Sequence, residues 1–446
     1  MPNKLTIAFQ KISPGLHKIL GNISWLLFER VLRMGVGFFV AVWIARYLGP
    51  EQFGLFSYAI AFVTLFSSIA MLGLDQIVVR DIVREKPNSD EILGTAFAMR
   101  LTAGVVVLLL TVGIVSLLRP GDELVHWLVA IIAAGMVFQP FDTIDLWFQS
   151  QVKSKYTVCA KSITFLIASF IKIILVVIGA PLIAFAWVYL AEIFLGASGL
   201  VIAYRLYGHH LKKWRVHLGR AWGLLSQGWP LILSGLAIAV YMRIDLVMLG
   251  ELADSDAVGI YSVAVRLSEW WNFIPMAIVA SVLPSIIQAK QVDNQLYLQR
   301  MQHLLNFVVT LAVVIAIPLT FVSTPLIVQL LGQEYAAAGP VVAIHIWSAV
   351  FVFMGVGGSA WLVAEGLFKT SLAQSILGGV LNVVLNFWLI PAFSALGAAI
   401  ATLVSYAVGN YLLTAVFFRG YPLFGMQTRA LFSFWRISSY RSHADG

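Results

Sequence analysis

Six positively charged side chains stand inside long apolar segments of this 446-residue chain, where an uncompensated charge is costly. They are Arg30, Arg33, Arg100, Lys172, Arg243 and Arg266. Arg30 and Arg33 are three residues apart and would share one helix face. Because the planar guanidinium fork can hold two phosphate oxygens at once, we expect this pair to bind an anionic group. The alternative is a structural clasp, in which Glu29, or Asp75 on the next segment, pairs with an arginine.

Two more arginines, Arg243 and Arg266, lie on two later, neighbouring segments, at depths comparable to each other. We expect Arg243 and Arg266 to face a cavity and to provide further contacts for an anionic group. Glu269 lies three residues after Arg266 and would share its helix face. A local ion pair between these two residues is therefore the alternative.

Four oxygen-bearing side chains in the second half of the chain have the chemistry of a cation site. Asp245 lies two residues after Arg243, so the two side chains point to nearly opposite sides of a helix. Asn382 and Asn386 are one helical turn apart, and Thr402 lies on the following segment. Carboxylate, amide and hydroxyl oxygens are the ligands that hard cations prefer. The alternative is that the two amides only form hydrogen bonds between helices.

The remaining charges inside apolar segments are expected to form ion pairs or gates. Lys172 and Glu192 fall on consecutive segments, and we expect a structural lock there rather than a proton relay. Arg100 is expected to face either the cavity or Asp142 and Asp145. These two aspartates share a helix face near a group of lysines, which suits a gate or a clasp.

The composition identifies the elements that must position these residues. The chain is 60% hydrophobic and 11% charged, with a mean hydropathy of +0.90. Its apolar segments are long enough to cross a hydrocarbon core of about 30 Å. The sequence therefore predicts an all-α integral membrane protein with about 12 transmembrane helices in two pseudo-symmetric six-helix lobes around a central cavity. The expected helices are 22–46, 53–80, 92–118, 124–150, 156–179, 182–206, 221–250, 258–288, 297–323, 340–365, 371–391 and 395–419, and 322–339 is either a loop or a short helix.

The connections between these segments alternate between loops rich in Lys and Arg and loops nearly free of them. One set of loops and the termini holds 21 of the 29 Lys and Arg residues, whereas the other set holds only Arg46 and Arg119. Lys and Arg are concentrated in cytoplasmic loops. We therefore predict a multi-pass membrane protein with both termini in the cytoplasm. The terminal clusters are Lys4, Lys11 and Lys18, and Arg419, Arg429, Arg436 and Arg441.

The two halves of the chain show weak internal similarity. Residues 53–59 (FGLFSYA) correspond to 258–264 (VGIYSVA), and 159–163 (CAKSI) correspond to 372–376 (LAQSI). A six-helix unit duplicated in parallel orientation is a transporter pattern. The alternative is chance matching between apolar helices. We predict an N-terminal lobe at 1–208, a basic cytoplasmic linker at 209–220, a C-terminal lobe at 221–419 and a basic tail at 420–446.

Three stretches resemble a known family. The run 43–57 (WIARYLGPEQFGLFS) is similar to the opening of bacterial polysaccharide-repeat flippases, as are 73–80 (GLDQIVVR) and 331–335 (LGQEY). These flippases belong to the multidrug/oligosaccharidyl-lipid/polysaccharide exporter superfamily, which also contains the lipid II flippases. The resemblance spans residues 20–420. It implies translocation of undecaprenyl-diphosphate-linked oligosaccharide, such as an O-antigen or exopolysaccharide unit, from the cytoplasmic to the outer leaflet.

The resemblance also assigns roles to the residues singled out above. Arg30, Arg33, Arg243 and Arg266 would contact the lipid diphosphate. The oxygen set is similar to the sodium site of lipid II flippases, in which the backbone oxygen at the position of Ala398 is a further ligand. The lipid II flippase pattern can have an acid where this chain has Asn386, so the ligand set here carries less charge. The implied coupling ion is Na⁺ or H⁺, with no other cofactor.

Two other functions are alternatives for this sequence. A multidrug antiporter of the same superfamily would have an acidic cavity, which the six embedded cations disfavour. A membrane glycosyltransferase or polymerase would need a sizeable outer domain, and the outer loops are short, so we predict no enzyme. The single Cys159 and the isolated His303 and His345 do not predict a metal cluster. The expected partners are the lipid-linked oligosaccharide, membrane lipids and, as a candidate, a polysaccharide polymerase; we expect a monomer and no nucleic acid.

Overall fold

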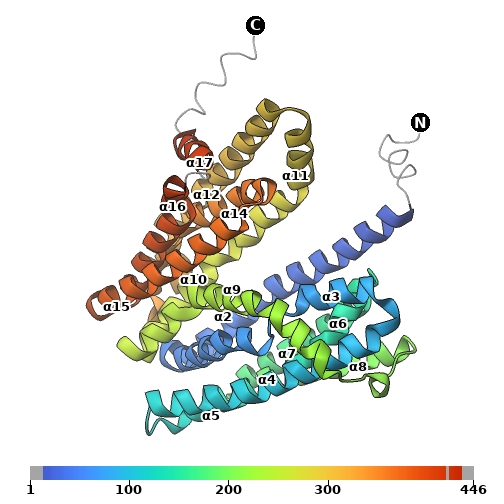
Figure 1. Cartoon of the computed structure of the whole chain (residues 1–446). Coiled ribbons are helices and arrows are strands. Elements are labelled where there is room, and N and C mark those ends of the chain that lie inside the picture. The colour runs from blue at the N-terminus through green and yellow to red at the C-terminus, as the bar shows by residue number, and fades with distance from the viewer. Residues whose placement is uncertain (1–13, 418–420, 434–446) are drawn as a thin grey trace, which may run out of the picture. The chain divides into compact units, whose positions relative to one another are not determined.

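The computed structural model describes residues 14–417 and 421–433, and within these ranges the chain forms only helices and short turns (Figure 1). The α-helices are α2 (Pro14–Ala70), α3 (Asp75–Arg84), α4 (Ser89–Leu118), α5 (Glu123–Ala134), α6 (Thr143–Ser150), α7 (Lys155–Val177), α8 (Leu182–Leu206), α9 (Leu218–Leu252), α10 (Ser255–Glu269), α11 (Phe273–Val292), α12 (Asn294–Leu331), α13 (Ala338–His345), α14 (Ser348–Glu365), α15 (Phe368–Ala407), α16 (Leu413–Val416) and α17 (Tyr421–Ser433). Short 3₁₀ turns include η2 (Gly135–Val137), η3 (Gln139–Asp142) and η5 (Trp270–Asn272). Lys4, Lys11, Arg419, Arg436 and Arg441, which entered the topology prediction, lie outside the described residues.

The helices account for twelve membrane crossings. Within the described residues, ten helical segments are long and apolar enough to cross a membrane. Two of them, Ser24–Arg84 and Lys369–Val416, each contain two crossings, because the chain turns at Gly49 (φ 71°) and at Ser394 (φ 51°). A positive φ is unstrained for glycine, which suits Gly49 to the first of these turns. The predicted all-α membrane fold is confirmed.

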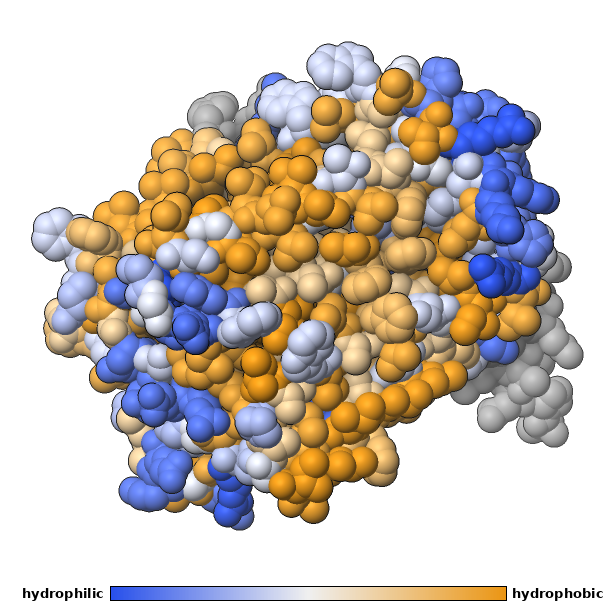
Figure 2. Space-filling view, turned by 90° about the horizontal axis from the view of Figure 1, so that it is seen from below, coloured by the Kyte–Doolittle hydropathy of each residue, from blue (hydrophilic) through white to orange (hydrophobic). Residues whose placement is uncertain are grey.

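The surface of these helices suits contact with lipid. Large apolar side chains such as Leu117, Phe321 and Trp388 are exposed. Hydrophobic residues dominate the face drawn in Figure 2, and hydrophilic residues gather toward its edges. A soluble protein rarely exposes apolar surface on this scale, so the exposed side chains are expected to face lipid tails.

Four crossings that we expected as unbroken helices are interrupted. The helix expected at 53–80 ends at Ala70, and Leu72 and Gly73 then adopt positive φ. The helix expected at 124–150 is broken by η2 and η3, and the one expected at 258–288 is broken by η5. The helix expected at 340–365 is broken by a turn at 346–347. Pro140 in η3 accounts for part of one break, since it has no backbone N–H to donate. The stretch 322–339, which the sequence left open, continues α12 as far as Leu331.

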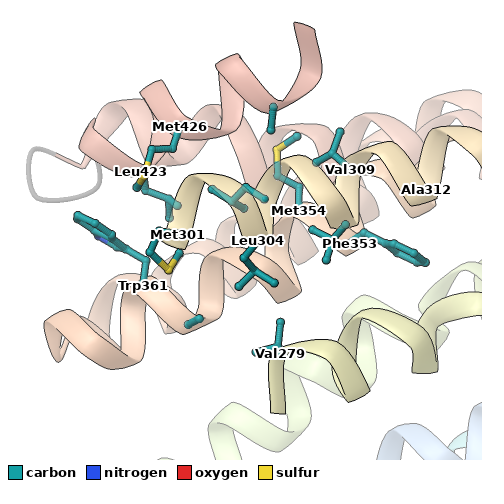
Figure 3. Close-up of a cluster of buried hydrophobic side chains, with 14 of the residues drawn as sticks. Val279, Met301, Leu304, Val309, Ala312, Phe353, Met354, Trp361, Leu423 and Met426 are labelled. Carbon is teal, nitrogen blue, oxygen red and sulfur yellow. The ribbon is translucent and has the colours of Figure 1, made fainter. Parts of the chain in front are cut away.

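The chain forms two compact units. The first unit contains residues up to Ile44 and Phe62–Leu236, and the second contains Ala45–Ala61 and the chain from Ala237 onward. In the second unit, α12 packs against α14 and α17, where Met301, Phe353 and Leu423 are buried in a shared apolar core (Figure 3). The linker expected at 209–220 packs within the first unit, where the Arg215 N–H donates to the Asp90 carbonyl.

The two copies of the repeated motif, 53–59 and 258–264, pack against each other within the second unit. A Cβ atom added at Gly54 would lie 1.8 Å from the Ser255 carbonyl oxygen, and one at Gly259 would lie 2.0 Å from that of Pro50. Only glycine allows the two backbones to approach so closely. The Ser57 hydroxyl donates to the Ser262 hydroxyl at 3.2 Å, and these residues are 205 positions apart, as are the two glycines. Equivalent positions of the repeat therefore meet in one seam.

Candidate functional site

The structure brings together the four side chains predicted to form a cation site. The Asp245 carboxylate, on α9, is buried, and its Oδ1 accepts from Asn386 Nδ2 at 2.6 Å. Its Oδ2 accepts from the Thr402 hydroxyl at 2.6 Å. Asn386 Nδ2 also donates to Asn382 Oδ1 at 3.0 Å, so both asparagines of α15 join the network. Ala398 is buried on α15 one helical turn before Thr402.

One oxygen of this network is left without a donor. Asn386 Oδ1 is buried and has no hydrogen-bond partner within the described residues. A buried acceptor without a donor is costly, and a bound cation would satisfy it. The structure therefore brings the four predicted residues together as one hydrogen-bonded network, and the binding of a cation by Asp245, Asn382, Asn386 and Thr402 stays a prediction.

The sequence analysis missed Tyr261. Its hydroxyl donates to Asp245 Oδ2 at 2.7 Å and lies 3.0 Å from the Thr402 hydroxyl. His345, which the sequence left isolated, is buried with its ring 5.9 Å from that of Tyr261. An aromatic residue in an apolar helix is typical of a core, and only the position of Tyr261 within the repeated motif singles it out.

The two arginines of the second unit are accessible. The Arg243 side chain is 37% exposed, and its Nη1 lies 4.0 Å from Glu269 Oε2. Arg266 is exposed, with its guanidinium 5.6 Å from the centre of the Phe53 ring. The Arg266–Glu269 ion pair within α10 is not formed in the described part of the chain, although Arg266 interacts electrostatically with both Glu269 and Arg243. Glu269 is thus a loosely held counter-ion for two accessible cations.

The arginines of the first unit differ from each other. Arg30 is exposed. Arg33 is engaged through all three guanidinium nitrogens: Nε donates to Glu29 at 3.1 Å, Nη2 donates to the Lys161 carbonyl at 3.1 Å, and Nη1 lies 3.7 Å from Glu192. The clasp with Glu29 therefore forms, and these contacts make Arg33 less available to an anionic ligand.

Two other predicted pairings are corrected. Asp75 pairs with Arg100, whose Nη2 donates to it at 2.9 Å, a partner that the sequence analysis did not name. Arg100 is fully buried and pairs with neither Asp142 nor Asp145. Both alternatives were open because an apolar helix gives no sign of its rotation about its own axis.

The acidic pair of the first unit has a basic partner near the start of the following helix. Lys161, on α7, lies 2.9 Å from Asp142 and 2.8 Å from Asp145. The predicted pair of Lys172 and Glu192 forms at 2.8 Å. Lys161 was counted among the cytoplasmic cations because it falls near the start of its helix.

Comparison with known sequences decides the family. The profile described as polysaccharide biosynthesis protein matches residues 19–290, more than half of the chain. The chain belongs to this family. A second profile, MatE, matches residues 230–388. Among polysaccharide biosynthesis proteins and their relatives, the probable flippase AglR of Haloferax volcanii is 26% identical over 411 residues, which cover 88% of this chain and 82% of that protein. The probable low-salt glycan biosynthesis flippase Agl15 of the same organism is 26% identical over 189 residues, or 41% of this chain and 39% of that protein.

Solved structures show the fold of this family member. The lipid II flippase MurJ, in an inward closed conformation, matches with a TM-score of 0.73 at 15% identity, over 96% of this chain and 94% of that chain. An inward-facing multidrug resistance MATE family transporter of the MOP superfamily matches with a TM-score of 0.70 at 15% identity, over 94% and 99%. These matches confirm the predicted exporter fold. The named relatives are flippases and transporters, in agreement with the prediction of a carrier rather than an enzyme.

Proposed function

We propose that this protein translocates undecaprenyl-diphosphate-linked oligosaccharide from the cytoplasmic to the outer leaflet, for assembly of a surface polysaccharide such as O-antigen or exopolysaccharide. The observation that carries the proposal is the pair of accessible arginines, Arg243 and Arg266, on apolar spans. Relatives described as glycan flippases support it. We further propose the cytoplasmic membrane of a bacterial cell as the location, a monomer as the working state and a polysaccharide polymerase as a partner.

The arginines would replace the hydration that the diphosphate loses inside the membrane. Arg243 and Arg266 would bind phosphate oxygens, and the diphosphate would displace Glu269, which is held at only 4.0 Å. In the first unit, Arg30 would contact the diphosphate earlier, as it arrives from the cytoplasmic side, and Arg33 would hold the carboxylates of Glu29 and Glu192 in place. The polyprenyl tail stays in lipid throughout. Outward movement of negative charge across an inside-negative membrane is favourable by about 2.3 kcal/mol per charge per 100 mV.

The Asp245 network would reset the carrier. An empty cavity that carries excess positive charge must then return to its inward-facing state, and the same potential favours this inward movement of positive charge. We propose that Na⁺ or H⁺, held by Asp245, Asn382, Asn386 and Thr402 with the carbonyl of Ala398, biases this step. The buried Asn386 oxygen without a donor supports a bound cation. Tyr261, which donates to Asp245, would have to release that hydrogen bond or share it with the ion.

A multidrug antiporter is the second candidate function, because the MatE profile and a MATE transporter structure match the chain. That function predicts a cavity whose accessible charges are mainly acidic. The accessible Arg243 and Arg266 do not suit a cationic drug, so we favour the glycan substrate.

Deletion of the gene tests the proposed function. We expect one surface polysaccharide to disappear while its lipid-linked repeat unit accumulates at the cytoplasmic face, measured by extraction of the lipid and accessibility of the glycan to an added lectin. Loss of drug resistance with unchanged surface glycan would instead support the antiporter.

The predicted topology can be tested with single cysteines. Cysteines placed at the predicted outer positions should react with an impermeant maleimide in intact cells, and those at the predicted inner positions should react only after lysis. The native Cys159 is replaced by serine first, so that only the new thiol is detected. Labelling of residue 212 in intact cells would overturn the orientation. The outer positions are Asp122, Asp254 and Glu334, and the inner positions are Asn88, Lys212 and Gln291.

The cation site can be tested by thermal unfolding of the purified protein. Sodium should raise the melting temperature more than potassium at equal ionic strength, because saturation of a site at 100-fold the Kd stabilises the folded state by about 2.7 kcal/mol. Asp245→Asn removes the only formal charge among the proposed ligands and should erase the shift. A sodium-independent melting curve with transport that follows pH would assign the role to a proton on Asp245.

A further inference from the structure

A polar cavity of about 410 Å³ lies within the first unit, apart from the Asp245 network and the Arg243–Arg266 pair. Helices α2, α7 and α8, the turn η3 and the residue just before it supply its walls, through Arg33, Lys161, Glu192, Phe138, Gln139 and Tyr189. The volume falls in the range of small-molecule sites. A charged cavity inside an apolar bundle is costly, which by default indicates a function.

The charges of this cavity are paired with one another. Glu192 lies 3.7 Å from Arg33 and 2.8 Å from Lys172. Lys161 bridges Asp142 and Asp145 at 2.9 and 2.8 Å. With Glu29 beside Arg33, four carboxylates stand against three cations. The cluster is therefore close to neutral and slightly acidic, so it does not attract a diphosphate. A cation gains little there either, because each carboxylate already has an ammonium or guanidinium partner.

Because neither an anion nor a cation is favoured, the ligand that suits this cavity is a neutral group that forms many hydrogen bonds. A hydroxyl group donates to one acceptor and accepts from one donor, and neighbouring carboxylates and ammonium or guanidinium groups offer both. The ion pairs hold these groups in fixed positions before a ligand arrives, which lowers the entropic cost of binding. Gln139 Oε1 is buried and has no hydrogen-bond partner among the described residues. It offers one further acceptor, while Phe138 and Tyr189 offer apolar ring faces.

We propose that this cavity is a carbohydrate subsite, which binds neutral sugar residues of the lipid-linked glycan. The inference rests on the proposed function and extends it to the part of the substrate that distinguishes one glycan from another. In the predicted topology the cavity borders the cytoplasmic half of α7, through Lys161 and Thr164, which is the side from which a cytoplasmic glycan arrives. Asp142, Lys161 and Glu192 act here as hydrogen-bonding groups for hydroxyls rather than as a gate.

The test is a binding measurement on the full chain in nanodiscs with two lipids. One is the lipid-linked oligosaccharide extracted from a strain that lacks this protein, and the other is undecaprenyl diphosphate without sugar. Gly196→Leu should fill part of the cavity, since a Cβ atom there has no neighbour closer than Thr164 Oγ1 at 3.9 Å. We expect at least a tenfold loss of affinity for the glycosylated lipid, and less than a twofold change for the bare lipid.

Two further variants keep the result interpretable. Gln139→Ala removes atoms without filling the cavity and should weaken only the glycosylated lipid, by about three- to tenfold. Gly113→Leu places the same side chain at a helical position on α4 with no atom within 4 Å, and should change neither affinity.

The outcomes separate the two proposals. If wild-type protein binds both lipids and Gly196→Leu weakens both equally, or neither, the cavity is only structural and the carbohydrate subsite is refuted, while the proposed function stands. If wild-type protein binds neither lipid, the proposed function fails and the subsite fails with it.

Discussion

Replacement of Arg243 and Arg266 together by glutamine should abolish glycan export without reducing the amount of protein in the membrane. Both side chains are accessible, and within the described residues the ion pair that Arg243 makes is long, 4.0 Å to Glu269, so the double replacement breaks no tight ion pair there. A diphosphate inside a low-dielectric cavity depends on such charges. We expect at least a hundredfold loss of exported glycan, measured by extraction of surface polysaccharide, with accumulation of the lipid-linked precursor.

Charge and geometry can be separated at the same positions. Arg243→Lys keeps the charge and loses the bidentate fork, so export should be only partly restored relative to glutamine. Arg205→Gln serves as the matched control, because Arg205 is an exposed arginine at the end of α8, distant in sequence from both sites. Normal export by the double glutamine variant, at wild-type protein levels, would rule out the cationic contact.

The sequence predicts the crossings but not their breaks. Length and apolar composition determine where a helix can span, and the distribution of Lys and Arg indicates an orientation. The interruptions at 71–74 and at η5 depend on packing: Leu72 takes a positive φ without a glycine at that position. Bends at Gly49 and Ser394 show the same contrast, since a glycine marks the first turn and an ordinary serine the second.

In the candidate site, too, some contacts could be predicted from the sequence and others could not. Asn382 and Asn386 were predictable as a pair because helical spacing places them on one face, and a buried carboxylate such as Asp245 needs donors. The partners of Arg33, Asp75 and Arg100 were not predictable. These helices are apolar on nearly all sides, so the sequence does not show which face a given residue occupies, and only packing decides which of several acids lies within reach.

A disulfide between Ser57→Cys and Ser262→Cys should form readily and stop glycan export until it is reduced. The two hydroxyls are 3.2 Å apart in the seam where the repeated motifs meet, and Gly54 and Gly259 bring the backbones close enough for a bridge. The seam lies next to the Gly49 bend, on the predicted outer side. The two segments belong to the two repeated halves of the chain, and if alternating access moves these halves against each other, a covalent tie across the seam should trap one state. Crosslinking is read from gel mobility, and export from surface glycan before and after addition of a reductant.

Because the chain contains a single cysteine, one substitution removes every native thiol that could form a competing disulfide. With Cys159 replaced by serine, each single-cysteine variant reports the effect of the substitution itself, and both should export normally under oxidising conditions. The expected loss is near complete in the crosslinked fraction and reversible, because the tie adds no bulk to the cavity and touches neither Arg243 nor Asp245. A crosslinked protein that exports at the wild-type rate would show that the seam stays closed throughout transport, and the repeat contact would then be a fixed structural joint. A pair that never crosslinks would contradict the close approach of the two glycines itself.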